Sequence, residues 1–170
     1  MHSELDHLRQ AIASATRGMS VEDLARRPSE GKWCAAEVLE HLYLTHARTV
    51  KGCERCLAAN RPLATTANLR QRLRKAVVMT TGRMPSGRSA PEGTRPGGLR
   101  VPTILAEFEA KLGRMDELLT QCEARYGRGV RILDHPILGP LTSSQWRKFH
   151  RIHGIHHAKQ LTQLQARRSE

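Results

Sequence analysis

Four of the nine histidines lie close together near the C-terminal end of the chain, at positions 150, 153, 156 and 157. Residues four apart on a helix share one face and lie about 6 Å apart along its axis, so His153 and His157 should project together. Two imidazoles at that spacing can bind one divalent cation at nitrogen–metal distances of about 2.1 Å. His156 is rotated by about 100° from His157 and should point elsewhere. The alternative is an exposed or merely packed pair on a basic helix.

A third ligand must come from another helix, because two histidines leave a metal undercoordinated. His41 is the strongest candidate, since it stands among leucines in a helical segment, where a polar side chain facing the core needs a partner. In the competing interpretation, this histidine only hydrogen-bonds a backbone carbonyl. His46 should lie on a different face, and His150 should lie near the metal face, one turn before His153.

Three histidines would leave coordination positions open, as catalytic zinc sites do and structural ones do not. Imidazole also suits nickel and iron, so the residues predict one divalent ion without fixing its identity. Such an ion can lower the pKa of a bound water or bind a thiol as thiolate. Glu37, one turn before His41, could orient that ring or act as a general base, but a solvated helix residue is the simpler interpretation. The sequence names no other catalytic group.

Long helical patterns must position these histidines. Apolar residues recur at helical spacing over five segments, 5–16, 33–59, 69–78, 103–126 and 143–166. Thr142 and Gln145 form a capping box before the last segment, and 135–140 is expected to be a rigid connector. Neither strand-like alternation nor an internal repeat is found. The patterns predict an all-α protein, an antiparallel four-helix bundle that occupies residues 1–170 as one domain.

The segment 80–102 differs in composition from the helices around it. It holds five glycines, four prolines, four arginines and a single acid. This composition leaves few apolar anchors and is typical of a loop. We expect a flexible crossover loop near the open side of the metal, where its basic residues attract an acidic ligand.

The formal charge of +12 is the strongest compositional feature. Basic proteins attract nucleic acids, anionic membranes and acidic small molecules. Here the basic residues are spread along the chain and only six residues are aromatic, so no tract resembles a platform for stacking single strands. No apolar run approaches the roughly 20 residues that span a bilayer. A specific nucleic-acid partner and a membrane partner are therefore not expected.

The four cysteines, Cys34, Cys53, Cys56 and Cys122, are expected to be reduced thiols. The first residues include acids and lack the pattern of an export signal, so a cytoplasmic location is expected. Cys53 and Cys56 have the spacing of a redox or zinc pair, but a second pair is missing and the segment has a helical pattern. Small buried hydrophobic side chains are the simpler interpretation.

Both ends of the chain resemble the bacterial DinB-like (DinB/YfiT) superfamily. Residues 33–45, in which Trp33 opens a helix and Glu-His-Leu follows at 40–42, resemble its second helix. Residues 153–160 resemble its closing His-x-x-His-His-x-x-Gln signature. The approach to that signature, from His-Pro-Ile-Leu-Gly at 135–139 to Gln-Trp at 145–146, is similar to one uncharacterised branch. The middle of the chain matches only in helical character.

The resemblance implies a four-helix bundle whose metal ligands are His41, His153 and His157. Characterised relatives include transferases that join low-molecular-weight thiols to electrophiles, and also hydrolases and isomerases. The resemblance therefore implies a small-molecule thiol or electrophile as partner, and homodimers are common in the superfamily. Two alternatives stay open: a metal-dependent hydrolase, and a non-catalytic, metal-stabilised bundle that acts through protein contacts.

Overall fold

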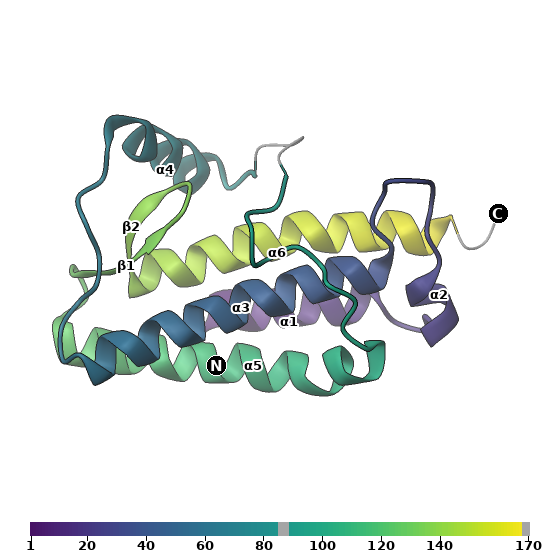
Figure 1. Cartoon of the computed structure of the whole chain (residues 1–170), viewed down its shortest axis with the longest axis horizontal. Coiled ribbons are helices and arrows are strands. Elements are labelled where there is room, and N and C mark those ends of the chain that lie inside the picture. The colour runs from purple at the N-terminus through teal and green to yellow at the C-terminus, as the bar shows by residue number, and fades with distance from the viewer. Residues whose placement is uncertain (85–88, 168–170) are drawn as a thin grey trace.

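The computed structural model describes residues 1–84 and 89–167, and four long helices lie side by side in it (Figure 1). These helices are α1 (Ser3–Ala15), α3 (Ala35–Ala58), α5 (Val101–Tyr126) and α6 (Ser143–Ala166). Two further helices are α2 (Val21–Ala25) and α4 (Leu69–Thr81). The predicted all-α bundle is confirmed. None of the helices in the described part of the chain is long and apolar enough to cross a membrane.

The four helices form two pairs, because α3 packs mainly on α5 and α1 mainly on α6. Within each pair the helices run parallel, and the two pairs run antiparallel to each other. In the α1–α6 pair, Leu8 lies beside Gly154 and Arg17 contacts Gln165, so residue numbers rise together along both helices. In the α3–α5 pair, Tyr43 contacts Glu107 and Glu54 contacts Arg114, with the same result. A parallel α3–α5 pair requires a long return connection, which the chain between them provides.

Gly154 lets α1 and α6 approach each other closely. A Cβ at this position would lie 1.9 Å from Cδ1 of Leu8, so a larger residue would require the Leu8 side chain or one of the helices to shift. Leucine is the commonest residue of the buried core, and several leucines have no exposed surface, among them Leu5, Leu8, Leu42, Leu112, Leu119 and Leu161. The histidine-bearing helix is therefore held firmly against the rest of the bundle.

Residues 131–142 form a β-hairpin of β1 (Arg131–His135) and β2 (Gly139–Thr142), so the expectation of a connector without strands was wrong. The two strands are too short to show alternation, and the first three residues of β2 are all buried. His135 Nδ1 accepts hydrogen bonds from the backbone N–H groups of Ile137 and Leu138, and Gly139 has a left-handed φ of 70°. These features close the turn.

The connection from α3 to α5 crosses the bundle. The last residue of helix α4 is Thr81, three residues beyond the predicted end at 78. Gly82, whose φ of 63° is left-handed, caps the helix. The predicted loop therefore begins later than residue 80, and its residues 85–88 lie outside the described ones. Residues 89–100, here called the strap, pass over α3 on the way to α5 (Figure 1). The carboxylate of Glu40 accepts hydrogen bonds from the N–H groups of Gly97 and Gly98, which ties the strap to α3.

Candidate metal centre

His41 on α3 and His153 and His157 on α6 lie together in the bundle. Nε2 of His153 is 3.1 Å from Nε2 of His41 and 3.1 Å from Nε2 of His157. All three side chains are buried, and the three nitrogen atoms lie within 4.8 Å of one another. This close approach depends on the antiparallel packing of α3 against α6 and on the i, i+4 spacing along α6.

Hydrogen bonds fix the orientation of two of these rings. Nδ1 of His41 donates to the carbonyl oxygen of Thr94 in the strap, at 2.6 Å. Nδ1 of His157 donates to Oε1 of Gln160 at 3.1 Å. With the proton on Nδ1, the Nε2 lone pair of each ring points toward His153. Such partners hold a histidine in the tautomer that a metal ion requires.

Burial keeps the three histidines neutral. It lowers the pKa of His41, although the bond to Thr94 opposes this shift. It also lowers the pKa of His157 to about 4, with the neighbouring His41 adding to the shift. The pKa of His153 falls well below its ordinary value, because of burial first and then because of His157 and His41. Neutral imidazoles at neutral pH are the form that binds a metal ion.

The geometry and the donor set fit one divalent ion. Ligand atoms about 2.1 Å from a metal in a tetrahedral arrangement lie about 3.4 Å apart, close to the observed nitrogen spacing. Three imidazoles that turn their Nε2 atoms toward one another cannot all find a donor among themselves. Nδ1 of His153 is buried and has no hydrogen-bond partner in the described part of the chain. Three buried histidines could thus hold a metal ion here.

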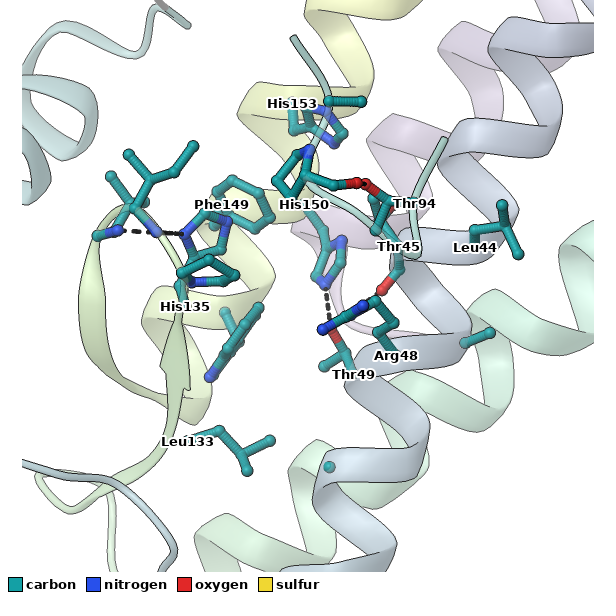
Figure 2. Close-up of a pocket in the computed structure, with 18 of the residues that line it drawn as sticks. Leu44, Thr45, Arg48, Thr49, Thr94, Leu133, His135, Phe149, His150 and His153 are labelled. Atoms are coloured by element: carbon teal, nitrogen blue, oxygen red, sulfur yellow. Dashed lines mark hydrogen bonds between the residues drawn. The ribbon is translucent and has the colours of Figure 1, made fainter. Parts of the chain in front are cut away.

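A cavity of about 1490 Å³ opens beside the three histidines. Helices α3, α4 and α6, the hairpin and the strap all contribute to its walls. Figure 2 shows His135 and Phe149 on one side of it, with Thr94, Thr45 and Arg48 on the other. The cavity is large enough for a small molecule that contacts the histidines and also reaches beyond them.

Comparison with protein-family models gives a match over residues 2–164 to the family described as "Protein of unknown function (DUF1569)". The chain belongs to the DUF1569 family. Neither the curated proteins nor the solved structures gave a match. Since the DUF1569 match includes both α3 and α6, the histidine cluster lies wholly within the region that the family shares.

Two further histidines of this DUF1569 chain are buried beside the cluster, but they do not join it. His150 Nε2 lies 2.9 Å from Oγ1 of Thr49, and the rings of His150 and His46 are 5.1 Å apart. His46, which was predicted to lie on a different face from His41, contacts His150 of α6 and Phe108 of α5 and is not one of the three possible ligands. His156 is exposed, as its rotation on the helix predicts.

Glu37 lies away from the three histidines. Its carboxylate accepts a hydrogen bond from the N–H of Cys34 at the start of α3 and pairs with Arg27 at 2.7 Å. It therefore caps the helix and neither orients His41 nor faces the cavity. The interpretation of Glu37 as a merely solvated residue missed this cap.

Sequence reasoning missed three residues that support the site: Glu40, Thr94 and Gln160. Glu40 anchors the strap, Thr94 offers its carbonyl to His41, and Gln160 accepts from His157. Gln160 is the last residue of the signature quoted for the superfamily, which is the one signal that pointed to it. The other two contacts join residues more than fifty positions apart, and no local pattern reveals them.

Proposed function

We propose that this DUF1569 protein is a DinB-like, metal-dependent enzyme in which His41, His153 and His157 hold one divalent ion. We propose further that it joins a low-molecular-weight thiol to an electrophilic carbon. The observation that carries this proposal is the convergence of three buried Nε2 atoms at the wall of a large cavity. The resemblance of the two histidine-bearing segments to the DinB-like superfamily adds the reaction class.

The number of ligands supports catalysis over a purely structural role. Structural zinc sites are usually closed by four protein ligands, whereas catalytic sites keep three and leave a position for water or substrate. The described residues offer three donors and no fourth cysteine, aspartate or glutamate within reach. A divalent ion bound there would supply Lewis acidity, which lowers the pKa of a thiol or water at its open position.

The carboxylates around the cavity favour a thiol over water as nucleophile. Hydrolysis by water is usually assisted by a carboxylate general base near the ion. Only two acids line the cavity in the described structure. Asp134 accepts hydrogen bonds from Thr65, and Glu54 pairs with Arg114 at 3.5 Å. Glu40 is also engaged, by the strap. A thiol with a lowered pKa loses its proton to solvent without such a base.

The nucleophile must come from outside the chain. Cys34, Cys53, Cys56 and Cys122 are all buried, and none of them lines the cavity. In the proposed reaction the sulfur of the bound thiol forms a bond to the electrophilic carbon, and the leaving group departs with the electron pair of the broken bond. The histidines, Trp33 and Phe149 position the reacting atoms and keep water from that end of the cavity.

Cobalt(II) substitution tests this proposal. Cobalt-loaded protein should develop an intense sulfur-to-cobalt charge-transfer band when 2-mercaptoethanol or cysteine is added. The same protein before addition is the baseline, which accounts for its own cysteines. His153→Ala should show no thiol-dependent band, whereas His156→Ala should keep it. Cobalt binding without any thiol-dependent band would contradict the thiol transferase and favour a hydrolase or a non-catalytic bundle.

A further inference from the structure

One face of α3 forms the floor of the cavity and carries three cations in series. Four residues of α3 line the cavity: His41, Arg48, Lys51 and Arg55. The intervals between them are seven, three and four residues, which is helical spacing. Residues at these intervals share a helix face. At a rise of 1.5 Å per residue, Arg48 lies about 10 Å along the axis from His41. The positive side chains thus lead away from the histidine cluster along the cavity.

The positive charge of this face is not neutralised by the protein. Neither acid that lines the cavity pairs with these cations: Glu54 pairs with Arg114, and Asp134 accepts hydrogen bonds from Thr65. Within the described residues, Arg48, Lys51 and Arg55 have no ion pair. Compared with an exposed surface, a concave site focuses such charge and strengthens its attraction for an anion. The cavity is therefore matched to an acidic ligand.

Arg48 is the cation that is best fixed in place. Its Nη1 donates to the carbonyl oxygen of Glu92 at 3.0 Å. Glu92 is two residues before Thr94, whose carbonyl accepts from His41. The strap therefore holds both the guanidinium and the imidazole by neighbouring carbonyl groups. Arg48 has five N–H donors, and the structure assigns one of them, so a fork of donors is left for a planar anion.

The wall opposite this charged face carries a group of apolar residues. Leu73, Val77 and Val78 of α4 and Leu133 and Leu138 of the hairpin line it. Leu73 and Val77 are more than half exposed, so side chains of the protein do not cover them. A ligand with an apolar body would cover them and gain free energy from the burial.

We propose that Arg48 determines substrate specificity by binding the carboxylate of an elongated acidic small molecule. The opposite end of that molecule reaches the histidine cluster, and its apolar middle lies against α4 and the hairpin. The proposal rests on the proposed function, since it takes the metal centre as the place where the other end binds. It adds a substrate class: elongated molecules with an acidic group at the end opposite the metal-binding atom.

A matched pair of hydroxamates tests the proposal without using thiol chemistry. One probe is the monohydroxamate of octanedioic acid, which has a free carboxylate at its far end, and the other has a primary amide there. Calorimetric titration of the zinc-loaded protein should give about tenfold tighter binding for the carboxylate, the size expected of a charge-assisted hydrogen bond. The ratio of the two dissociation constants is the readout, so a loosened strap that weakens both probes does not change it.

Three variants test whether Arg48 causes the difference between the dissociation constants of the two probes. Arg48→Gln should reduce it to about one, and Arg48→Lys should keep part of it. Arg70→Gln removes the same charge from an exposed position outside the cavity and should leave it unchanged. An unchanged ratio in Arg48→Gln, or equal binding of both probes by the unmodified protein, would overturn the Arg48 assignment and leave the metal centre intact. Failure of both probes to bind zinc-loaded protein would overturn the metal centre and the Arg48 assignment together.

Discussion

Two buried polar clusters lie on α6, and they differ in how many of their polar atoms have a hydrogen-bond or ion-pair partner. Around Arg147, every strong donor has an acceptor: Nε pairs with Asp116 at 2.8 Å, Nη1 with Glu123 at 2.8 Å, and Nη2 donates to Thr120 at 2.7 Å. The remaining oxygen of Asp116 accepts from the N–H of His2. Around His153, three Nε2 atoms face one another and a buried Nδ1 has no partner in the described structure.

We interpret this difference as one between a structural cluster and the proposed metal centre. Arg147 and Arg128 together balance the charges of Asp116 and Glu123, so the folded chain needs no further ion there. In the histidine cluster, the single proton that His153 Nε2 can carry cannot serve both neighbouring Nε2 atoms fully, whereas a cation would satisfy all three at once. An unsatisfied buried group costs free energy, which a protein without a use for it would be expected to avoid. The histidine cluster is the part of α6 that, together with His41 of α3, could hold a metal ion.

The largest effect should follow from breaking the satisfied cluster. Arg147→Met keeps much of the side-chain volume but leaves Asp116 without its ion-pair partner and Glu123 with Arg128 alone. The free energy of unfolding should fall by about 3–5 kcal/mol, because a buried charge is left uncompensated. Guanidinium unfolding followed by circular dichroism measures this loss. The folded variant should still bind one metal ion per chain.

The matched change in the histidine cluster should be far milder. In metal-free protein, His153→Leu replaces an imidazole with an apolar side chain of similar size and removes the unpartnered Nδ1. Its unfolding free energy should stay within about 1 kcal/mol of the unmodified protein, since removing an unsatisfied polar group is nearly neutral. A loss as large as that of Arg147→Met would mean that both clusters are structural.

Lowering the pH should reduce the free energy of unfolding through buried histidines that are not proposed metal ligands. Burial lowers the pKa of His135 to about 4 and that of His46 to about 3, whereas both regain an ordinary value near 6.5 on unfolding. The unfolded chain therefore binds more protons below pH 6.5. Stability from these residues is complete above pH 6.5 and is lost as pH falls toward 4, by about 2 kcal/mol for each histidine at pH 5.

Urea unfolding at pH 7 and pH 5, with a chelator present, measures this loss. His135→Asn keeps a side-chain acceptor for the turn but does not titrate, so its loss between the two pH values should be smaller by about 2 kcal/mol. An identical loss in this variant would exclude His135 as a source of acid instability.

The smallest effect concerns the strap. Glu40→Gln weakens the hydrogen bonds from Gly97 and Gly98 and should cost about 1 kcal/mol of stability. Because the strap also positions the carbonyl that holds His41, zinc affinity should fall by about tenfold. Competition with a fluorescent zinc chelator measures it. Glu37→Gln, which alters a helix cap and not the strap, should keep full zinc affinity; an equal loss would show that the strap has no special role.

Much of the helical framework could be predicted from the sequence, because long amphipathic patterns and caps are local signals. The last helix begins at Ser143 and ends at Ala166, as predicted, and its capping box of Thr142 and Gln145 is present. The hairpin was missed because strands of five and four residues carry too little periodicity. The parallel α3–α5 pairing was also hidden, since helix direction depends on the path of the connection.

The grouping of the histidines was predictable in part. The i, i+4 spacing places His153 and His157 on one face of any helix, and His41 stood out as a polar residue in an apolar stretch. The supporting contacts from Thr94 and Glu40 could not be foreseen, because they depend on where the strap crosses α3. Arg48 was equally hidden, since one arginine among many in a basic chain has no distinguishing local pattern.

Metal content is the most direct test of the account. Protein purified without chelator and dialysed against metal-free buffer should contain about one divalent ion per chain by elemental analysis. His41→Ala and His153→Ala should contain almost none, while His156→Ala, which removes an exposed histidine from the same helix, should retain the full amount. Full metal content in His153→Ala, or no bound ion in unmodified protein after incubation with zinc, would contradict the proposed centre.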